Sequence, residues 1–355
     1  MEFLIEGIGQ TSGIDEVVAR GCVDTIAIVV TDHDVAPRLT EYLDYIVGEI
    51  IKLLDTVTFV NFYDFLNDFV KLFAQQLAGP RIISLVSHLV ARISKEQAAK
   101  RDGSAADSSA IVLDKCMATL RICVDNGVYM PQLQAPFTEA LKPIFEFLAD
   151  PTQIAFEDDI VLLVKSIIKK TKAVSADMWI IFDQFPKIVT KASGALGDLL
   201  STMNYYVLYD APGFAAREAS IRGFAQIVEQ AMFTRKIAAD CEGAVACQLL
   251  FQCLRGTSSL DALLEPLLDL TRRRMDDDPT PIELKRHLFG VIMAAMYYNA
   301  PATLGYLESR QLTASVIEEM CEVRTSFRAE YERRFFIIGL TCMLRCPQLP
   351  VSLQP

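Results

Sequence analysis

Apolar residues recur at helical spacing along almost the whole chain, and one stretch shows the pattern most clearly. Between Phe156 and Pro186, the residues Ile160, Leu163, Val164, Ile167 and Ile168 fall on one face of a helix. Acidic residues open this helix and lysines close it, as the helix dipole favours. After a short connection, Ser175 or Asp177 can cap a second helix that carries Met178, Trp179, Phe182 and Phe185. The stretch predicts an antiparallel helical hairpin with more apolar surface than two helices can hide from each other.

Similar pairs of apolar segments follow one another from end to end. The first helix of each pair is expected to begin near residues 15, 59, 108, 155, 193, 238 and 281, and a final helix is expected over 325–346. This spacing matches the period of roughly 40–47 residues that is typical of HEAT and armadillo repeats. No strand-like alternation of apolar and polar residues competes with it. The sequence therefore predicts an all-α fold, a single right-handed α–α superhelix of HEAT or armadillo type over residues 1–355 with about seven helical pairs.

The stretch 99–109 is the one segment that is poor in apolar residues. Its sequence, AKRDGSAADSS, is rich in small and charged residues, and the helical period resumes directly after it. Such a composition predicts a mobile loop between two repeats rather than a linker between domains.

Composition narrows the classes of partner. The formal net charge is −11 over 355 residues, which argues against nucleic acid as a direct ligand and favours a partner that is itself basic. No stretch reaches the roughly 18 apolar residues that a membrane span needs. The nine cysteines lack the spacing of a disulfide framework, so we expect reduced thiols in a cytosolic or nuclear protein.

The sequence offers little material for catalysis or metal binding. The three histidines, His33, His88 and His287, have no partner at metal-ligand spacing, and Cys241, Cys247 and Cys253 recur every six residues and so cannot converge on one helix face. Nucleophile elbows, phosphate loops and dinucleotide glycine motifs are absent. We therefore expect no catalytic, cofactor-binding or metal-binding residues, and a protein that is not an enzyme.

An acidic stripe is the first feature that could carry binding. Asp261, Glu265 and Asp269 stack at i, i+4 and i+8, and Asp276, Asp277 and Asp278 follow. The stripe could be a solvated face with an i+4 pair between Asp269 and Arg273, which is the favoured interpretation, or an acidic patch for a basic cargo protein.

An aromatic ladder is the second feature that could carry binding. Phe62, Phe65 and Phe69 lie at helical spacing and could form an exposed slot for an aromatic residue of a partner. Packing in the core is the favoured interpretation, because the spacing is that of a buried stripe.

Three segments together resemble a known family. They are Phe156–Phe185 with its FEDDI start, ELKRHLFGVIMAAMYYN at Glu283–Asn299, and ERRFFIIGLTCML at Glu332–Leu344. They are similar to the C-terminal half of importin-beta-type nuclear transport receptors (karyopherins-beta). The nearest branch is that of importins seven and eight, which is related to the cellular apoptosis susceptibility exportin.

The resemblance implies a HEAT solenoid that carries cargo through nuclear pores. It implies that the second helices line a concave cargo surface, that outer helices offer apolar slots to phenylalanine-glycine nucleoporins, and that the GTPase Ran regulates cargo binding. It also implies a protein that moves between cytoplasm and nucleus. The family's main Ran-binding repeats have no counterpart here, so we expect a fragment or a shortened paralogue, with Ran binding mainly elsewhere.

Two other functions stay open at this stage. A HEAT-repeat scaffold subunit of a multiprotein complex would have the same repeats and no chemistry of its own. An exportin would bind its cargo together with Ran–GTP, whereas an importin releases cargo on binding Ran–GTP.

Overall fold

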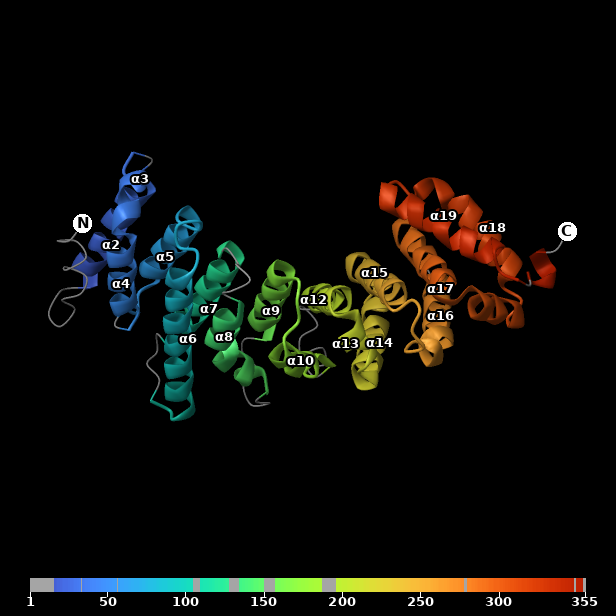
Figure 1. Cartoon of the computed structure of the whole chain (residues 1–355), viewed down its shortest axis with the longest axis horizontal. Helices are drawn as coiled ribbons and strands as arrows, with labels where there is room; N and C mark the ends of the chain where they lie inside the picture. The colour runs from blue at the N-terminus through green and yellow to red at the C-terminus, as the bar shows by residue number, and fades with distance from the viewer. Residues whose placement is uncertain are drawn as a thin grey trace. The chain divides into compact units, whose positions relative to one another are not determined.

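The computed structural model describes residues 16–32, 34–55, 57–104, 109–127, 134–149, 157–186, 196–277, 280–347 and 349–353. All regular secondary structure within these ranges is helical, which confirms the predicted all-α class (Figure 1). The chain divides into two compact units, residues 1–172 and 173–355. The boundary falls between the two helices of the predicted hairpin, α9 and α10, so each helix belongs to a different unit. The prediction of one continuous array stays a prediction.

The helices of the first unit form two rows. α2, α5, α7 and α9 contact one another in succession, and α4, α6 and α8 do the same beside them (Figure 1). The bounds are α2 (Glu16–Thr31), α3 (Ala36–Leu39), α4 (Leu43–Leu54), α5 (Val60–Leu72), α6 (Pro80–Arg101), α7 (Ser109–Asn126), α8 (Gln134–Ala149) and α9 (Glu157–Thr171), with a 3₁₀ turn at Thr40–Tyr42. Each helix thus packs against the next helix but one, as stacked helical pairs do.

The second unit repeats this plan. α12, α15, α17 and α19 follow one another in a first row, and α14 and α16 contact each other in a second. The bounds are α10 (Ala176–Phe182), α12 (Leu196–Tyr209), α13 (Ala211–Ala215), α14 (Glu218–Met232), α15 (Ile237–Cys253), α16 (Asp261–Asp276), α17 (Ile282–Ser309), α18 (Thr313–Val323) and α19 (Glu330–Leu344), with 3₁₀ turns at Arg324–Ser326 and Val351–Leu353. α17 is broken at Asn299, whose backbone (φ −151°, ψ 86°) is not helical, and its last turns lie beside α16.

Hydrogen bonds join neighbouring helical pairs in both units. Several join residues that lie 37 positions apart: Asn61 to Asp24, Arg81 to Asp44, Arg92 to the Asp55 carbonyl, Ser220 to Asp183, Tyr298 to Asp261 and Tyr306 to Asp269. Others span 34, 39, 41, 44 and 51 positions, so the separation varies around the length of a two-helix repeat. These bonds therefore support a repeat in both units.

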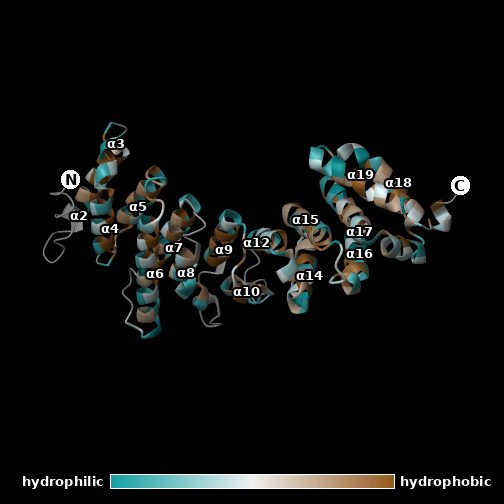
Figure 2. Cartoon of the chain, viewed as in Figure 1, coloured by the Kyte–Doolittle hydropathy of each residue, from teal (hydrophilic) through white to brown (hydrophobic). Residues whose placement is uncertain are grey.

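The core of each unit lies between its two rows. Figure 2 shows apolar and polar residues alternating along the helices, as expected for helices with one buried face. In the second unit Phe182 packs its ring against Trp179, Phe185, Tyr206 and Phe214 at centroid distances of 4.9–5.6 Å. Ser175 is the N-cap of α10, as one of the two predicted alternatives has it, and its Oγ accepts a hydrogen bond from the Met178 backbone N–H.

Several predicted boundaries can be compared with the helices. α5, α15 and α17 begin at Val60, Ile237 and Ile282, each within one residue of a predicted start, whereas the predicted starts at 15, 108, 155 and 193 lie outside the described residues. The final helix, α19, begins at Glu330 rather than 325, because a 3₁₀ turn occupies Arg324–Ser326. α6 extends to Arg101, so the first residues of the predicted loop 99–109 are helical, and residues 105–108 lie outside the described part.

Candidate protein-binding surfaces

Most of the acidic stripe of α16 is hydrogen-bonded to residues of α17 and to Arg310, which directly follows it. The Tyr298 hydroxyl donates to Asp261 Oδ1 at 2.8 Å, and the Tyr306 hydroxyl donates to Asp269 Oδ1 at 2.7 Å. Arg310 also donates to Asp269 Oδ2, at 3.1 Å. Glu265, between them, is exposed to solvent. Two of the three predicted carboxylates therefore tie repeats together, which leaves a smaller acidic surface for cargo than the sequence pattern indicates.

The predicted i+4 pair between Asp269 and Arg273 is wrong. Arg273 binds Glu229 of α14 at 2.8 Å, while Asp269 binds Arg310. The i+4 pair on this helix is formed instead by Arg272 and Asp276, 2.7 Å apart. Both differences arise because α14 and the end of α17 flank α16 and present charged groups that the sequence of α16 alone does not reveal.

The remaining acidic candidates are Asp276, Asp277 and Asp278. Asp276 is paired with Arg272, and the backbone carbonyl of Asp277 accepts from Arg274 NH1 at 2.9 Å. Asp278 lies outside the described residues. Asp276 and Asp277 therefore form contacts that stabilise the C-terminal end of α16. The acidic run in the sequence partly marks this helix end rather than a binding surface.

We expect Tyr298→Phe to lower the free energy of unfolding by about 1–2 kcal/mol, because the hydroxyl donates to Asp261 and accepts from the Leu260 N–H. Burial, and then the bond to Asp261, raise the pKa of Tyr298 to about 12. Because the pKa of Tyr298 is raised in the folded state, the protonated hydroxyl contributes fully to the free energy of unfolding below the ordinary pKa near 10. This contribution is lost as the pH rises from about 10 to 12. Urea unfolding measured between about pH 10 and 12 should therefore show that the free energy of unfolding falls more steeply with pH for the wild type than for Tyr298→Phe. Parallel curves would contradict this assignment.

The aromatic ladder is part of the core. Phe62, Phe65 and Phe69 of α5 are 0, 7 and 0 % exposed, and their rings contact one another. They cannot form an exposed slot without unfolding α5 from α2 and α7. The nucleoporin slot proposed for these residues is therefore corrected, and the favoured interpretation of the ladder as core packing holds.

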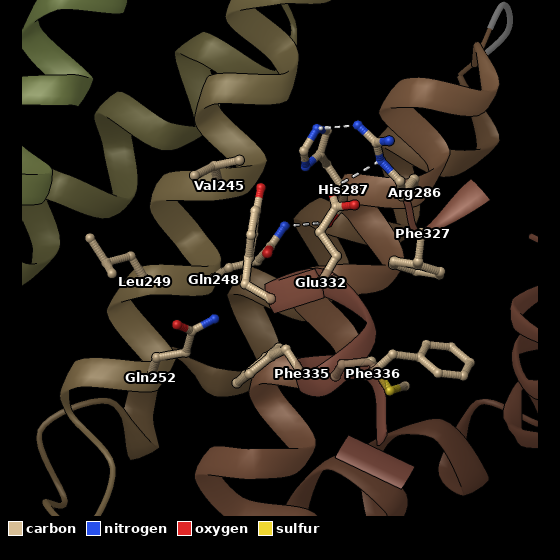
Figure 3. Close-up of a pocket in the computed structure, with 13 residues that line it drawn as sticks. Val245, Gln248, Leu249, Gln252, Arg286, His287, Phe327, Glu332, Phe335 and Phe336 are labelled. Carbon is tan, nitrogen blue, oxygen red and sulfur yellow. Dashed lines mark hydrogen bonds and ion pairs between the residues drawn. The ribbon is translucent and has the colours of Figure 1, made fainter. Parts of the chain in front are cut away.

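An apolar pocket opens elsewhere, between three successive first-row helices of the second unit. It has a volume of about 290 Å³ and lies between α15, α17 and α19 (Figure 3). Its walls are mostly apolar: Val245 and Leu249 from α15, Met293 from α17, and Tyr331, Phe335 and Phe336 from α19, with Phe327 before α19. Phe336 packs on Phe327 with ring centroids 5.0 Å apart. An apolar cavity of about 150 Å³ already suffices to bind benzene, so a phenylalanine ring fits here.

One side of the pocket carries a polar cluster. Arg286 Nε lies 3.4 Å from Glu332 Oε1, and Arg286 NH2 lies 3.3 Å from His287 Nε2 (Figure 3). Gln248 donates to the His287 carbonyl at 2.7 Å. Burial, followed by the positive charge of Arg286, lowers the pKa of His287, so its ring is neutral at pH 7. The cluster fixes α19 against α17 and places hydrogen-bonding groups beside an apolar wall.

The sequence of α19 carries a signal for this pocket. α19 contains Tyr331, Phe335 and Phe336 at positions that do not form a single buried stripe, and only Gly339 and Met343 of this helix are fully buried. An apolar helix that buries so few of its residues indicates a surface for a partner as readily as a core.

No family model and no curated protein matches this chain.

Within the described residues no helix is long and apolar enough to cross a membrane. No group of acidic, histidine and cysteine side chains that could hold a metal ion occurs in the same ranges. All nine cysteines are free thiols, and burial raises the pKa of Cys116 and of Cys241 to about 11.

Proposed function

We propose that this chain is a HEAT-repeat segment of a nuclear transport receptor, with the right-handed superhelix of that class. It binds cargo proteins and phenylalanine-glycine nucleoporins, moves between cytoplasm and nucleus, and is regulated by Ran. Basic proteins are the proposed cargo, in keeping with the net charge of −11.

The single observation that carries this proposal is the pocket between α15, α17 and α19. It lies between consecutive helices of one row, it is lined by aromatic and aliphatic side chains, and it has room for one aromatic ring. In the family that the sequence resembles, outer helices receive nucleoporin phenylalanines. The two-row packing and the hydrogen bonds between successive helical pairs support the same class of protein.

Binding of a phenylalanine-glycine nucleoporin segment tests the proposal. Val245 lines the pocket and is 39 % exposed, so Val245→Glu places a solvated carboxylate in the apolar wall. The variant should weaken this binding at least about tenfold, because a phenylalanine ring that enters the pocket would remove water from the charge. Ile282→Glu makes the same change at an exposed position outside the pocket and serves as the control.

Binding is measured by fluorescence anisotropy with a labelled nucleoporin segment and with a matched segment whose phenylalanines are replaced by serine. We expect the phenylalanine segment to bind the wild type and the Ile282→Glu variant equally, and the serine segment not to bind. Failure of the wild type to bind either segment, or equal binding by Val245→Glu, would overturn the assignment of the pocket.

A further inference from the structure

The side of α19 that faces away from the pocket is an exposed apolar ridge. Ile337 and Leu344 are 61 and 67 % exposed, and their separation of seven residues places them on the same side of the helix, two turns apart. The opposite side of α19 packs closely on α17: a Cβ at Gly339 would lie 2.7 Å from Met293 Sδ. Among the described residues, no helix covers the ridge.

Arginines flank this ridge on both sides. Arg333, Arg334 and Arg345 are exposed, and they lie on either side of Ile337 and Leu344 around the helix. α19 has two acidic residues. Glu330 pairs with Arg334 at the surface, and Glu332 is turned inward to Arg286. The ridge is therefore a positively charged surface on a chain of net charge −11.

This combination selects one kind of partner. We propose that the ridge docks an acidic amphipathic helix of another protein, whose apolar stripe packs on Ile337 and Leu344. Its carboxylates pair with Arg333 and Arg345 and compete with Glu330 for Arg334. Apolar residues spaced by seven, with charged residues beside them, are the pattern by which two helices recognise each other, and the flanking charges determine partner choice.

The alternatives fit the surface less well. The strongly acidic remainder of the chain would be repelled by an anionic bilayer, which disfavours a membrane as the occupant. A basic cargo would place like charges against the arginines. This docking site is separate from the pocket and binds a partner of opposite charge to the proposed cargo, so it does not depend on the nucleoporin assignment.

A pair of designed helical peptides tests the proposal on the full chain. One peptide carries leucines at heptad spacing with glutamates beside them, and the other carries lysines in place of the glutamates. We expect the glutamate peptide to bind at low salt, with affinity falling as salt rises, and the lysine peptide to bind at least about tenfold more weakly.

Variants locate the binding. Leu344→Asp should weaken binding of the glutamate peptide about thirtyfold, as loss of an interface anchor does. The double variant Arg333→Glu/Arg334→Glu should bind the lysine peptide more tightly than the glutamate peptide. Ile180→Asp/Arg222→Glu changes another exposed apolar residue and an exposed arginine elsewhere, and should change affinity by less than about twofold. Trp179 fluorescence, compared among the variants, confirms that each remains folded.

Three results would overturn the proposal. Equal binding of both peptides would mean that charge has no part in recognition. Sedimentation of the wild type with phosphatidylserine vesicles, abolished by Leu344→Asp, would assign the ridge to a membrane. Concentration-dependent self-association that Leu344→Asp abolishes would assign it to a second copy of the chain.

Discussion

Replacing Asp240 with asparagine is expected to lower the free energy of unfolding of residues 173–355 by about 3–5 kcal/mol. Asp240 and Arg274 are 0 and 4 % exposed, and Asp240 Oδ2 accepts from Arg274 Nε at 3.2 Å and from NH2 at 2.8 Å. Thr234 donates to the other carboxylate oxygen at 2.7 Å. Asparagine has nearly the same shape but no charge, so the variant leaves the buried guanidinium without its counter-ion.

Urea unfolding followed by the fluorescence of Trp179, the one tryptophan of the chain, measures this loss. Adding Arg274→Met to Asp240→Asn should restore part of the stability, because the second change removes the unpaired charge. Arg222→Met breaks an exposed ion pair with Glu218 and should cost less than about 1 kcal/mol. If Asp240→Asn and Arg222→Met cost the same, the buried pair does not hold α15 to α16 in the way described.

Phe182→Ala is expected to destabilise the same unit by about 3–5 kcal/mol. The Phe182 ring is buried and contacts the rings of Trp179, Phe185, Tyr206 and Phe214, so alanine leaves a cavity at the centre of this aromatic cluster. Thermal unfolding followed by circular dichroism should show a midpoint several degrees lower.

Ile180→Ala is the matched control for this change. Ile180 lies two residues away on the same helix but is exposed, so truncation should change the unfolding free energy by no more than about 0.5 kcal/mol. Equal midpoints for the two variants would show that α10 does not pack as described.

Local features of this fold were predictable from the sequence because they depend on neighbouring residues. The apolar spacing of Leu264, Leu267 and Leu268 determines which side of α16 is buried, and Ser175 caps α10 through a backbone N–H three residues away. The positions at which α5, α15 and α17 begin follow from the same local signals.

The binding surfaces were less predictable because they depend on residues far apart in sequence. Asp261 and Asp269 form a regular acidic stripe, but their partners Tyr298 and Tyr306 lie 37 residues away and become visible only when the repeats are stacked. Phe62, Phe65 and Phe69 have the same spacing whether they face a core or a slot, and only the packing of α5 decides between the two. The pocket takes residues from three helices between Val245 and Phe336, so the aromatic residues of α19 indicate only one of its walls.

Accumulation of the fluorescently labelled chain at the nuclear envelope of permeabilised cells measures whether this pocket acts at nuclear pores. The wild type and Ile282→Glu should give a bright nuclear rim, and Val245→Glu, at equal concentration and equally folded, should not. A rim of equal intensity for Val245→Glu, or no rim for the wild type, would contradict the claim that the pocket between α15, α17 and α19 brings this protein to nuclear pores.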